Sequence, residues 1–378
     1  MNIKTTLKTS VAAAALFAIA APVSAGTVSN SNDTASVTLS GHFNKAVLWM
    51  NDGEASRVSI VGNNNSRTRG RIVVKGKLNE AVSYTALSEW GMESNTSSSV
   101  SPGGSDATAS PEVGSDAQFD QRHTMVRMSH KSFGSIRLGQ TSEANDGITE
   151  NNMSGATDVV YGGNTVVGNG IALRLDSAAG STVASGTTVG DFIGAAGEGG
   201  RTDTIRYDTP SFGGFSAAAS FQGDQSFSYA ARYGGKFGGI KVKAGYGGTV
   251  EGGSASANEL SHGGSVALGH DSGLNLRMSG GVQTKEANGA DNSWNLSFGG
   301  GYKANLVSAG STNFAVDWTR FHNASTDADE MDLLSIGVEQ ETDAGVKFYL
   351  GYQLFSAEQG IVEYDNASTV MAGTKVFF

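Results

Sequence analysis

Cysteine is absent from this sequence and proline is scarce, because the 378 residues include no Cys and only 4 Pro. Without Cys the chain has neither disulfides nor thiolate metal sites. Hydrophobic residues make up 38% of the chain, below the roughly 45–50% that is usual for globular domains. The composition therefore excludes a disulfide scaffold and does not favour several well-packed globular domains.

Long hydrophobic runs are also missing. After residue 25 no stretch approaches the roughly 18 consecutive apolar residues of a transmembrane helix. The one apolar run near the start, "VAAAALFAIAA", follows Lys4 and Lys8 and precedes the small residues Val23, Ser24 and Ala25. This order is typical of a cleaved secretory signal peptide, which we expect over residues 1–25.

Positive charge and catalytic motifs are in short supply. Without residues 1–25 the chain carries 24 basic and 36 acidic residues, a net charge of about −12 that disfavours nucleic-acid binding. The six His are scattered, and neither a H-E-x-x-H nor a G-x-S-x-G motif occurs. We therefore expect no enzyme activity and no cofactor. An exported chain without a transmembrane helix is either soluble or a closed β-barrel.

Strict alternation of apolar and polar residues is what the chain does have. In "GVKFYLGYQLF" at 345–355, one face carries Val346, Phe348 and Leu350, and the other carries Lys347 and Gly351. Such alternation predicts strands with one apolar face. About sixteen runs show it, many of them with the roughly 9–11 residues that a tilted strand needs to cross a bilayer. They are 36–50, 69–78, 82–92, 122–130, 134–140, 204–208, 215–222, 228–237, 240–248, 262–269, 275–283, 292–302, 313–321, 331–341, 346–355 and 369–378.

The connections between these runs alternate between long and short, with 303–312 as a longish turn among the short ones. Outer-membrane barrels have long external loops and short periplasmic turns, whereas a soluble meander has no reason to sort its loops. The sequence therefore predicts that residues 26–378 form a 16-stranded antiparallel transmembrane β-barrel. Aromatic residues near the run ends suggest the girdles of such barrels. They are Trp49, Trp90, Tyr207, Phe212, Phe237, Trp318, Phe321, Tyr352, Phe355 and Phe378.

Four stretches of the chain carry further motifs. They are "VTLSGHFNKAVLWMNDG" at 37–53, "RTRGRIVVKGKLN" at 67–79, "SFGSIRLGQTSEANDGI" at 132–148 and "RTDTIRYDTPSFGGF" at 201–215. In their order and spacing they resemble the general Gram-negative porins, in particular their alphaproteobacterial branch. The resemblance implies a homotrimer in the outer membrane that passes ions and small hydrophilic solutes through a water-filled pore. A substrate-specific channel of the same fold is the alternative. The terminal Phe378 also resembles the C-terminal insertion signal of outer-membrane proteins.

The resemblance further implies that the third external loop, which begins after Gln140, folds into the barrel and narrows it. On that basis we expect an acidic side of the constriction from Glu143, Asp146, Glu150 and Asp158. The facing wall should be basic, with Arg69, Arg71, Arg122, Arg137 and Arg206. Opposed rows of fixed charge discriminate permeants. The third loop carries seven acids in all, which outnumber the five arginines, so the sequence predicts weak cation selectivity.

Two further features leave alternatives open. Many relatives carry a basic residue on the first strand, but here Lys45 has the lipid-facing parity and Asn44 the lumen parity, so this strand contributes a neutral group unless a bulge re-aims Lys45. The stretch "DADEMD" at 327–332 offers oxygen ligands of the kind that Ca²⁺ accepts, but it lacks the spacing of a calcium loop. A solvated loop tip is the alternative there.

Overall fold

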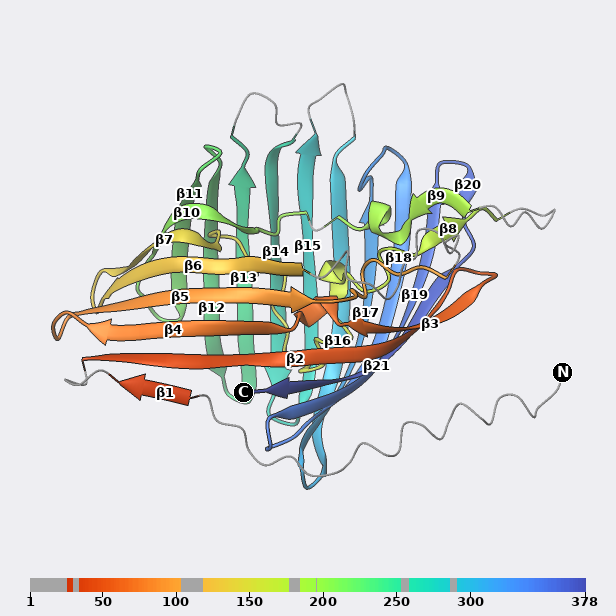
Figure 1. Cartoon of the computed structure of the whole chain (residues 1–378). Helices are drawn as coiled ribbons and strands as arrows, with labels where there is room; N and C mark the ends of the chain where they lie inside the picture. Colours follow the sequence, from red (N-terminus) through yellow and green to blue (C-terminus); the bar gives the residue numbers. More distant parts are fainter. Residues whose placement is uncertain are drawn as a thin grey trace.

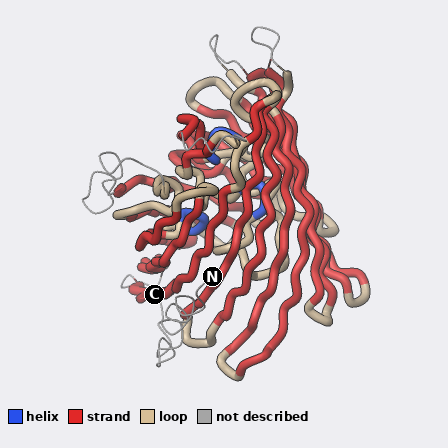
Figure 2. Tube along the Cα trace, turned by 90° about the vertical axis from the view of Figure 1, so that its right-hand side faces the viewer, coloured by secondary structure: helices blue, strands red, loops and turns tan. Residues whose placement is uncertain are grey.

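Sixteen strands close into an antiparallel β-barrel in the computed structural model (Figures 1 and 2). It describes residues 26–29, 34–102, 118–176, 184–194, 196–252, 258–285 and 291–378; the expected signal peptide at 1–25 lies outside them. The barrel strands are β2 (Ala35–Asn51), β4 (Arg69–Lys77), β5 (Val82–Glu93), β6 (Gln118–His130), β7 (Gly134–Ser142), β10 (Arg201–Asp208), β11 (Phe215–Gln222), β12 (Phe227–Phe237), β13 (Ile240–Val250), β14 (Asn258–His270), β15 (Leu274–Lys285), β16 (Ser293–Val307), β17 (Gly310–His322), β18 (Asp329–Glu341), β19 (Val346–Gln359) and β21 (Ala367–Phe377). The predicted fold class is confirmed.

The remaining elements are short and decorate the barrel. β1 (Gly26–Ser29) and β3 (Ser56–Gly62) pair with β2, and β20 (Val362–Glu363) pairs with β19. β8 (Ala172–Arg174) and β9 (Ala184–Thr188) form a separate hairpin. The 3₁₀-helices are η1 (Asn64–Ser66), η2 (Gly162–Asn164) and η3 (Val189–Phe192). Within the described ranges, no helix has the length and apolar character needed to cross a membrane.

The C-terminal strand closes the barrel against the first long strand. The Gly41 amide donates to the carbonyl of Phe378 over 2.9 Å, and the Phe378 amide donates back to Gly41 over 3.1 Å. The Phe378 ring lies 5.5 Å from that of Phe43, which is 55% exposed on the outer face. The terminal aromatic residue is thus held by the outer surface of β2.

The ends of the strands differ most from the sequence prediction at one hairpin. The prediction of a longish turn over 303–312 is wrong, because β16 continues to Val307 and β17 begins at Gly310. Leu306 and Val307 are both exposed there. The strands therefore project past the closed wall as a solvated hairpin, and the small polar residues at their tip hide the continuation.

Two of the expected girdle aromatics face inward instead. Phe321 and Phe355 are 1% and 0% exposed and belong to a buried apolar cluster, so their assignment to the girdle is wrong. Their parity explains this result, because Phe355 shares a face with Gly351 and not with the exposed Leu350.

The long segment between β7 and β10 runs along the inner faces of successive strands. The Ala144 amide donates to Ser220 Oγ of β11 over 2.9 Å. Further along, Asn151 Nδ2 donates to Ser265 Oγ of β14 over 3.0 Å, and Thr165 accepts from Gln353 of β19 over 3.0 Å. This third-loop segment, residues 143–200, therefore lines the wall from β11 to β19 and leaves the inner faces of β4–β7 free of such contacts among the described residues.

Glycines on the wall make room for the third-loop segment. A Cβ at Gly351 would lie 2.5 Å from Val159 Cβ, and one at Gly337 would lie 2.5 Å from Val159 Cγ2. Separations this short do not occur between real side chains, so any larger residue would displace the loop. The loop is seated in the wall at these points.

An apolar core fills the space between the third-loop segment and the strands behind it. Val167, Ile171 and Phe192 of the loop are buried with inward residues of the wall. The wall residues of this cluster include Leu48 and Met50 of β2, Phe321 of β17, Met331 and Leu333 of β18, Phe355 of β19 and Met371 of β21. One side of the barrel interior is therefore packed like a globular core.

Candidate pore constriction

Three of the predicted arginines converge on one carboxylate. Arg122 Nε donates to Glu89 Oε1 over 2.8 Å, Arg69 Nη1 lies 3.6 Å from the same oxygen, and Arg71 Nη1 lies 4.0 Å from Oε2. The register places Arg71 directly opposite Glu89 on neighbouring strands. A register shift beside Glu89 brings Arg122 inward. This Glu89 cluster carries three positive charges and one negative charge.

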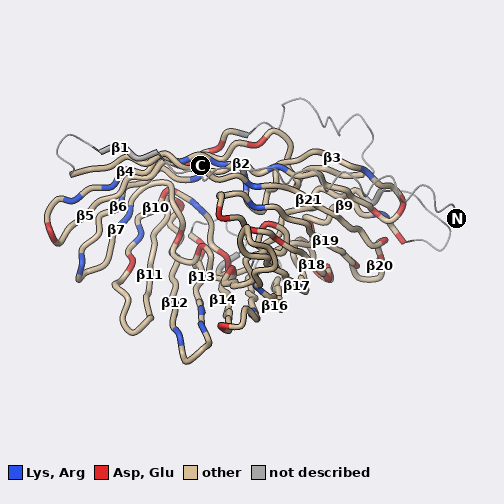
Figure 3. The backbone as a smooth tube through the Cα atoms, turned by 90° about the horizontal axis from the view of Figure 1, so that it is seen from below, with Lys and Arg blue, Asp and Glu red and all other residues tan. Residues whose placement is uncertain are grey.

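The other two predicted arginines share a second carboxylate. Arg137 Nη2 donates to Asp208 Oδ2 over 2.8 Å, and Arg206 Nη2 donates to Asp208 Oδ1 over 2.6 Å. Arg206 Nη1 also donates to the backbone carbonyl of Glu143 over 2.5 Å, which ties the start of the third loop to β10. All five predicted arginines thus point inward, four of them by strand parity and Arg122 through the register shift, and Figure 3 shows Lys and Arg along β4–β7.

The predicted loop acids divide into three kinds of environment. Asp146 lies 3.6 Å from Arg201, which in turn donates to His123 of β6 over 3.2 Å, so this acid faces the arginine side. Glu150 accepts from the Tyr161 hydroxyl over 2.8 Å. Burial raises the pKa of Glu150, and it likewise raises the pKa of Glu143. Burial therefore disfavours the charged form of both groups.

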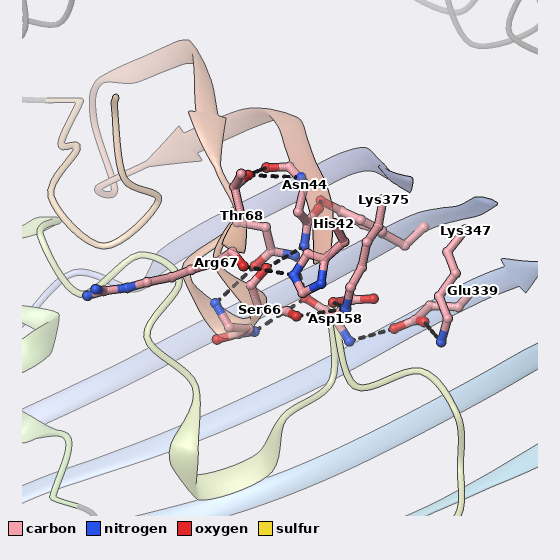
Figure 4. A network of polar contacts seen from close by, with 12 residues as sticks. His42, Asn44, Ser66, Arg67, Thr68, Asp158, Glu339, Lys347 and Lys375 are labelled. Atoms are coloured by element: carbon pink, nitrogen blue, oxygen red, sulfur yellow. Dashed lines mark hydrogen bonds and ion pairs between the residues drawn. The ribbon is translucent and has the colours of Figure 1, made fainter. Parts of the chain in front are cut away.

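Asp158 pairs with a lysine of the C-terminal strand and with none of the predicted arginines (Figure 4). Its Oδ1 accepts from Lys375 Nζ over 2.8 Å, and its amide donates to Glu339 Oε1 over 2.5 Å. Asn63 Nδ2 donates to its carbonyl over 2.8 Å. Asp158 is 1% exposed, so it anchors the loop to the wall and does not line an aqueous slot. The physical reason is the path of the loop, which sequence alone does not give.

Glu198, which was not among the predicted site residues, joins the end of the third loop to its beginning. Glu198 accepts from the backbone amides of Gly147, Ile148 and Thr149 and from the Thr149 hydroxyl, with 2.8 Å to the Thr149 amide. Burial, followed by the charge of Glu150, raises the pKa of Glu198 to about 7. A change of protonation at this carboxyl would alter the charge beside Asp146 and Glu150.

Several inward residues were missed by sequence reasoning. Glu89, Arg127, Arg201 and Arg232 all lie on strands and point inward, and Arg232 Nη2 donates to the Asp146 carbonyl over 2.9 Å. Charged residues at inward parity are the signal that finds Glu89 and Arg127. Parity misses Arg201, because it shares the parity of the exposed Ile205 and Tyr207. Only its contacts with His123 and Asp146 show that the side chain reaches inward.

Asn44 and the acidic stretch at 327–332 have defined partners. Asn44 is fully buried, and its Oδ1 accepts from the Tyr349 hydroxyl over 2.5 Å, whereas Lys45 is exposed. The first long strand therefore contributes the neutral Asn44 to the interior, as expected from its parity. Asp329 caps the amides of its own loop, and Asp332 pairs with Arg320 at 2.5 Å. In the part of the chain that is described, no three acidic or His side chains group as metal ligands.

Solved structures similar to this chain are outer-membrane porins. An anion-selective porin from Comamonas acidovorans aligns with a TM-score of 0.60 and 16% identity, covering 91% of this chain and 100% of that one. A trimer form of OmpT from Vibrio cholerae gives 0.57 and 12%, covering 92% and 100%. OmpF from Salmonella typhi gives 0.56 and 12%, covering 93% and 100%. At these identities the likeness shows the fold.

Sequence comparison supplies the family. A search of curated proteins returned no match. The profile described as Gram-negative porin, however, matches residues 10–360, which is most of the chain and includes every residue of the Glu89 cluster and the third loop. The chain therefore belongs to the Gram-negative porin family.

Proposed function

We propose that this chain is a general diffusion porin of the outer membrane, through which ions and small hydrophilic solutes pass passively. One observation carries the proposal. The third-loop segment lines the inner wall from β11 to β19, while Arg69, Arg71 and Arg122 project from the opposite wall around Glu89. The water-filled path is the space between the loop and these arginines.

The same observation changes the expected selectivity. The prediction of weak cation selectivity counted loop acids as if all of them faced the pore. Asp158 is neutralised by Lys375, and burial raises the pKa of Glu143, Glu150 and Glu198. The arginines keep their charge at any physiological pH. We therefore propose a weak preference for anions, set by the Glu89 cluster and Arg201 against Asp146.

Conductance measurements test this proposal. Purified protein in a planar bilayer should give an ohmic conductance that rises in proportion to salt concentration, as expected of a water-filled pore without a tight binding site. Saturation of the conductance by one solute at low concentration would instead favour the substrate-specific alternative. A chain that carries no current in a bilayer would contradict both.

Assembly is a second part of the proposal. We propose a homotrimer, supported by the trimer form of the similar OmpT and by apolar side chains on the outer faces of β2 and β3. Ile60 and Val58 of β3 are 75% and 61% exposed in the single chain, which suits contact with a neighbouring copy. Mass measurement in mild detergent should give three times the chain mass, and a stable monomer would count against this assembly.

A further inference from the structure

A row of arginines crosses three neighbouring strands on the inner wall. The register places Arg127 of β6 directly opposite Arg137 of β7, and Arg137 directly opposite Arg206 of β10. Lys75 of β4 lies on the same row, with Thr85 between it and Arg127. Like charges that face each other directly on adjacent strands destabilise a sheet. The arginine row, Arg127, Arg137 and Arg206, therefore needs a source of negative charge.

The protein supplies only part of that charge. Asp208 pairs with both Arg137 and Arg206, so three guanidinium groups share one carboxylate and the row keeps a net charge of +2. In the described residues Arg127 has neither an ion pair nor a hydrogen-bond acceptor, and its Nε and that of Arg137 are buried without acceptors. The donors of Arg206 are satisfied by Asp208 and two backbone carbonyls. The guanidinium donors that lack an acceptor therefore belong to the neighbouring Arg127 and Arg137.

The row is separate from the Glu89 cluster and open to the other end of the pore. Arg127 and Arg137 each lie three residues from the short turn that joins β6 to β7. Short turns mark the periplasmic side of an outer-membrane barrel. Arg122 lies five residues further along β6, about 16 Å away at the rise of a β-strand. An anion held here lies in the periplasmic vestibule, where its negative charge opposes the passage of chloride and so reduces the current.

Guanidinium groups select the chemical class of the ligand. Their planar forks bind oxyanions through paired, charge-assisted hydrogen bonds, which a spherical halide cannot reproduce. A net charge of +2 favours a divalent anion. From this geometry we infer that Arg127 and Arg137 form a binding site for divalent oxyanions such as phosphate on the periplasmic side of the pore. The inference rests on the proposed open channel, since the ligand must enter from the lumen.

Block of the chloride current by inorganic phosphate tests the site. Current through the full-length protein is recorded in KCl at constant ionic strength while phosphate is added at pH 7.5, where the divalent form predominates. A charge-assisted hydrogen bond contributes a factor of about ten to binding. Arg127→Gln should raise the half-blocking phosphate concentration about tenfold. Arg127→Lys, which keeps the charge but loses the fork, should raise it by a smaller factor.

Arg57→Gln is the matched control. It removes one arginine charge from β3, where Arg57 lies opposite Met50 near the external end of β2 and has no ion pair in the described structure. Phosphate should block the Arg57→Gln channel at the same half-blocking concentration as the wild type. The inference is overturned if the Arg127→Gln channel keeps the half-blocking phosphate concentration of the wild type, or if Arg57→Gln raises that concentration as much as Arg127→Gln does. It is also overturned if phosphate lowers the current no more than chloride at the same ionic strength. In each of these cases a normal chloride current persists, whereas failure of the proposed channel function leaves no current. If Arg127→Gln does not fold, Arg127→Lys decides between the same outcomes.

Discussion

The two sides of the barrel interior are built on opposite principles. Behind the third loop, β17, β18, β19 and β21 turn Phe, Leu and Met inward, and the loop covers them as an apolar core. Across the pore, β4–β7 turn arginines inward, and the described part of the third loop makes no hydrogen bond to these strands. A porin interior is commonly described as polar. Here one wall is largely apolar because the loop packs against it, so the position of the loop decides the chemistry of each wall.

Truncating a side chain should lower the free energy of unfolding more on the side of the barrel that the loop covers than on the arginine side. Phe355→Ala removes a fully buried ring from the core between loop and wall. Removing a buried Phe typically lowers the free energy of unfolding by about 3–5 kcal/mol. Thr85→Ala on the arginine side is the control and should change it by less than about 0.5 kcal/mol. Urea unfolding in detergent measures both, and equal losses would show that the two sides do not differ as described.

A larger side chain at Gly351, where Val159 of the third loop packs, should move the loop and thereby change the width of the pore. Gly351→Val places a side chain where Val159 now lies, a clash that typically costs about 1–3 kcal/mol. We expect an altered single-channel conductance because the loop must move toward the arginines. Val159→Ala in the same chain returns the space and should restore the conductance. A Gly351→Val channel that conducts like the wild type would mean that the seat does not position the loop.

Acid should strengthen the preference for anions. Glu198 has a pKa of about 7 in the folded protein, above its ordinary value of 4.5. Between these values the folded chain holds a proton that the unfolded chain has lost, so this group favours folding less as pH rises through that window. Over the same window, lowering the pH removes a negative charge beside Asp146. The reversal potential should move toward anions from pH 8 to pH 6.

Glu198→Gln is the test of that assignment. The amide keeps the shape of the side chain but does not titrate, so the part of the pH response due to this group should vanish and the pH 8 selectivity should approach that of the wild type at pH 6. An unchanged pH response in Glu198→Gln would assign the titration to another group.

Sequence reasoning reached the barrel because alternation and loop sorting are local properties of strands. It reached Arg69, Arg71 and Arg137 by the same parity argument. The loop was different, because nothing in its order of residues states which wall it follows. Asp158 looked like Asp146 in the sequence, yet one is buried beside Lys375 and the other faces Arg201. The inward core was hidden too, since a Phe at the end of a strand reads equally as girdle or core.

The reversal potential under a KCl gradient tests most directly the central claim, that the arginine wall facing the loop sets ion selection. The wild type should favour chloride weakly. Arg71→Gln with Arg122→Gln should move the potential toward cations, because one unit charge near an ion in water changes its local concentration by about fivefold before screening. Asp146→Asn with Glu150→Gln should move the reversal potential toward anions, and by a smaller amount, because burial raises the pKa of Glu150 and disfavours its charged form. If both double variants keep the wild-type potential, these residues do not line the constriction and the account is contradicted.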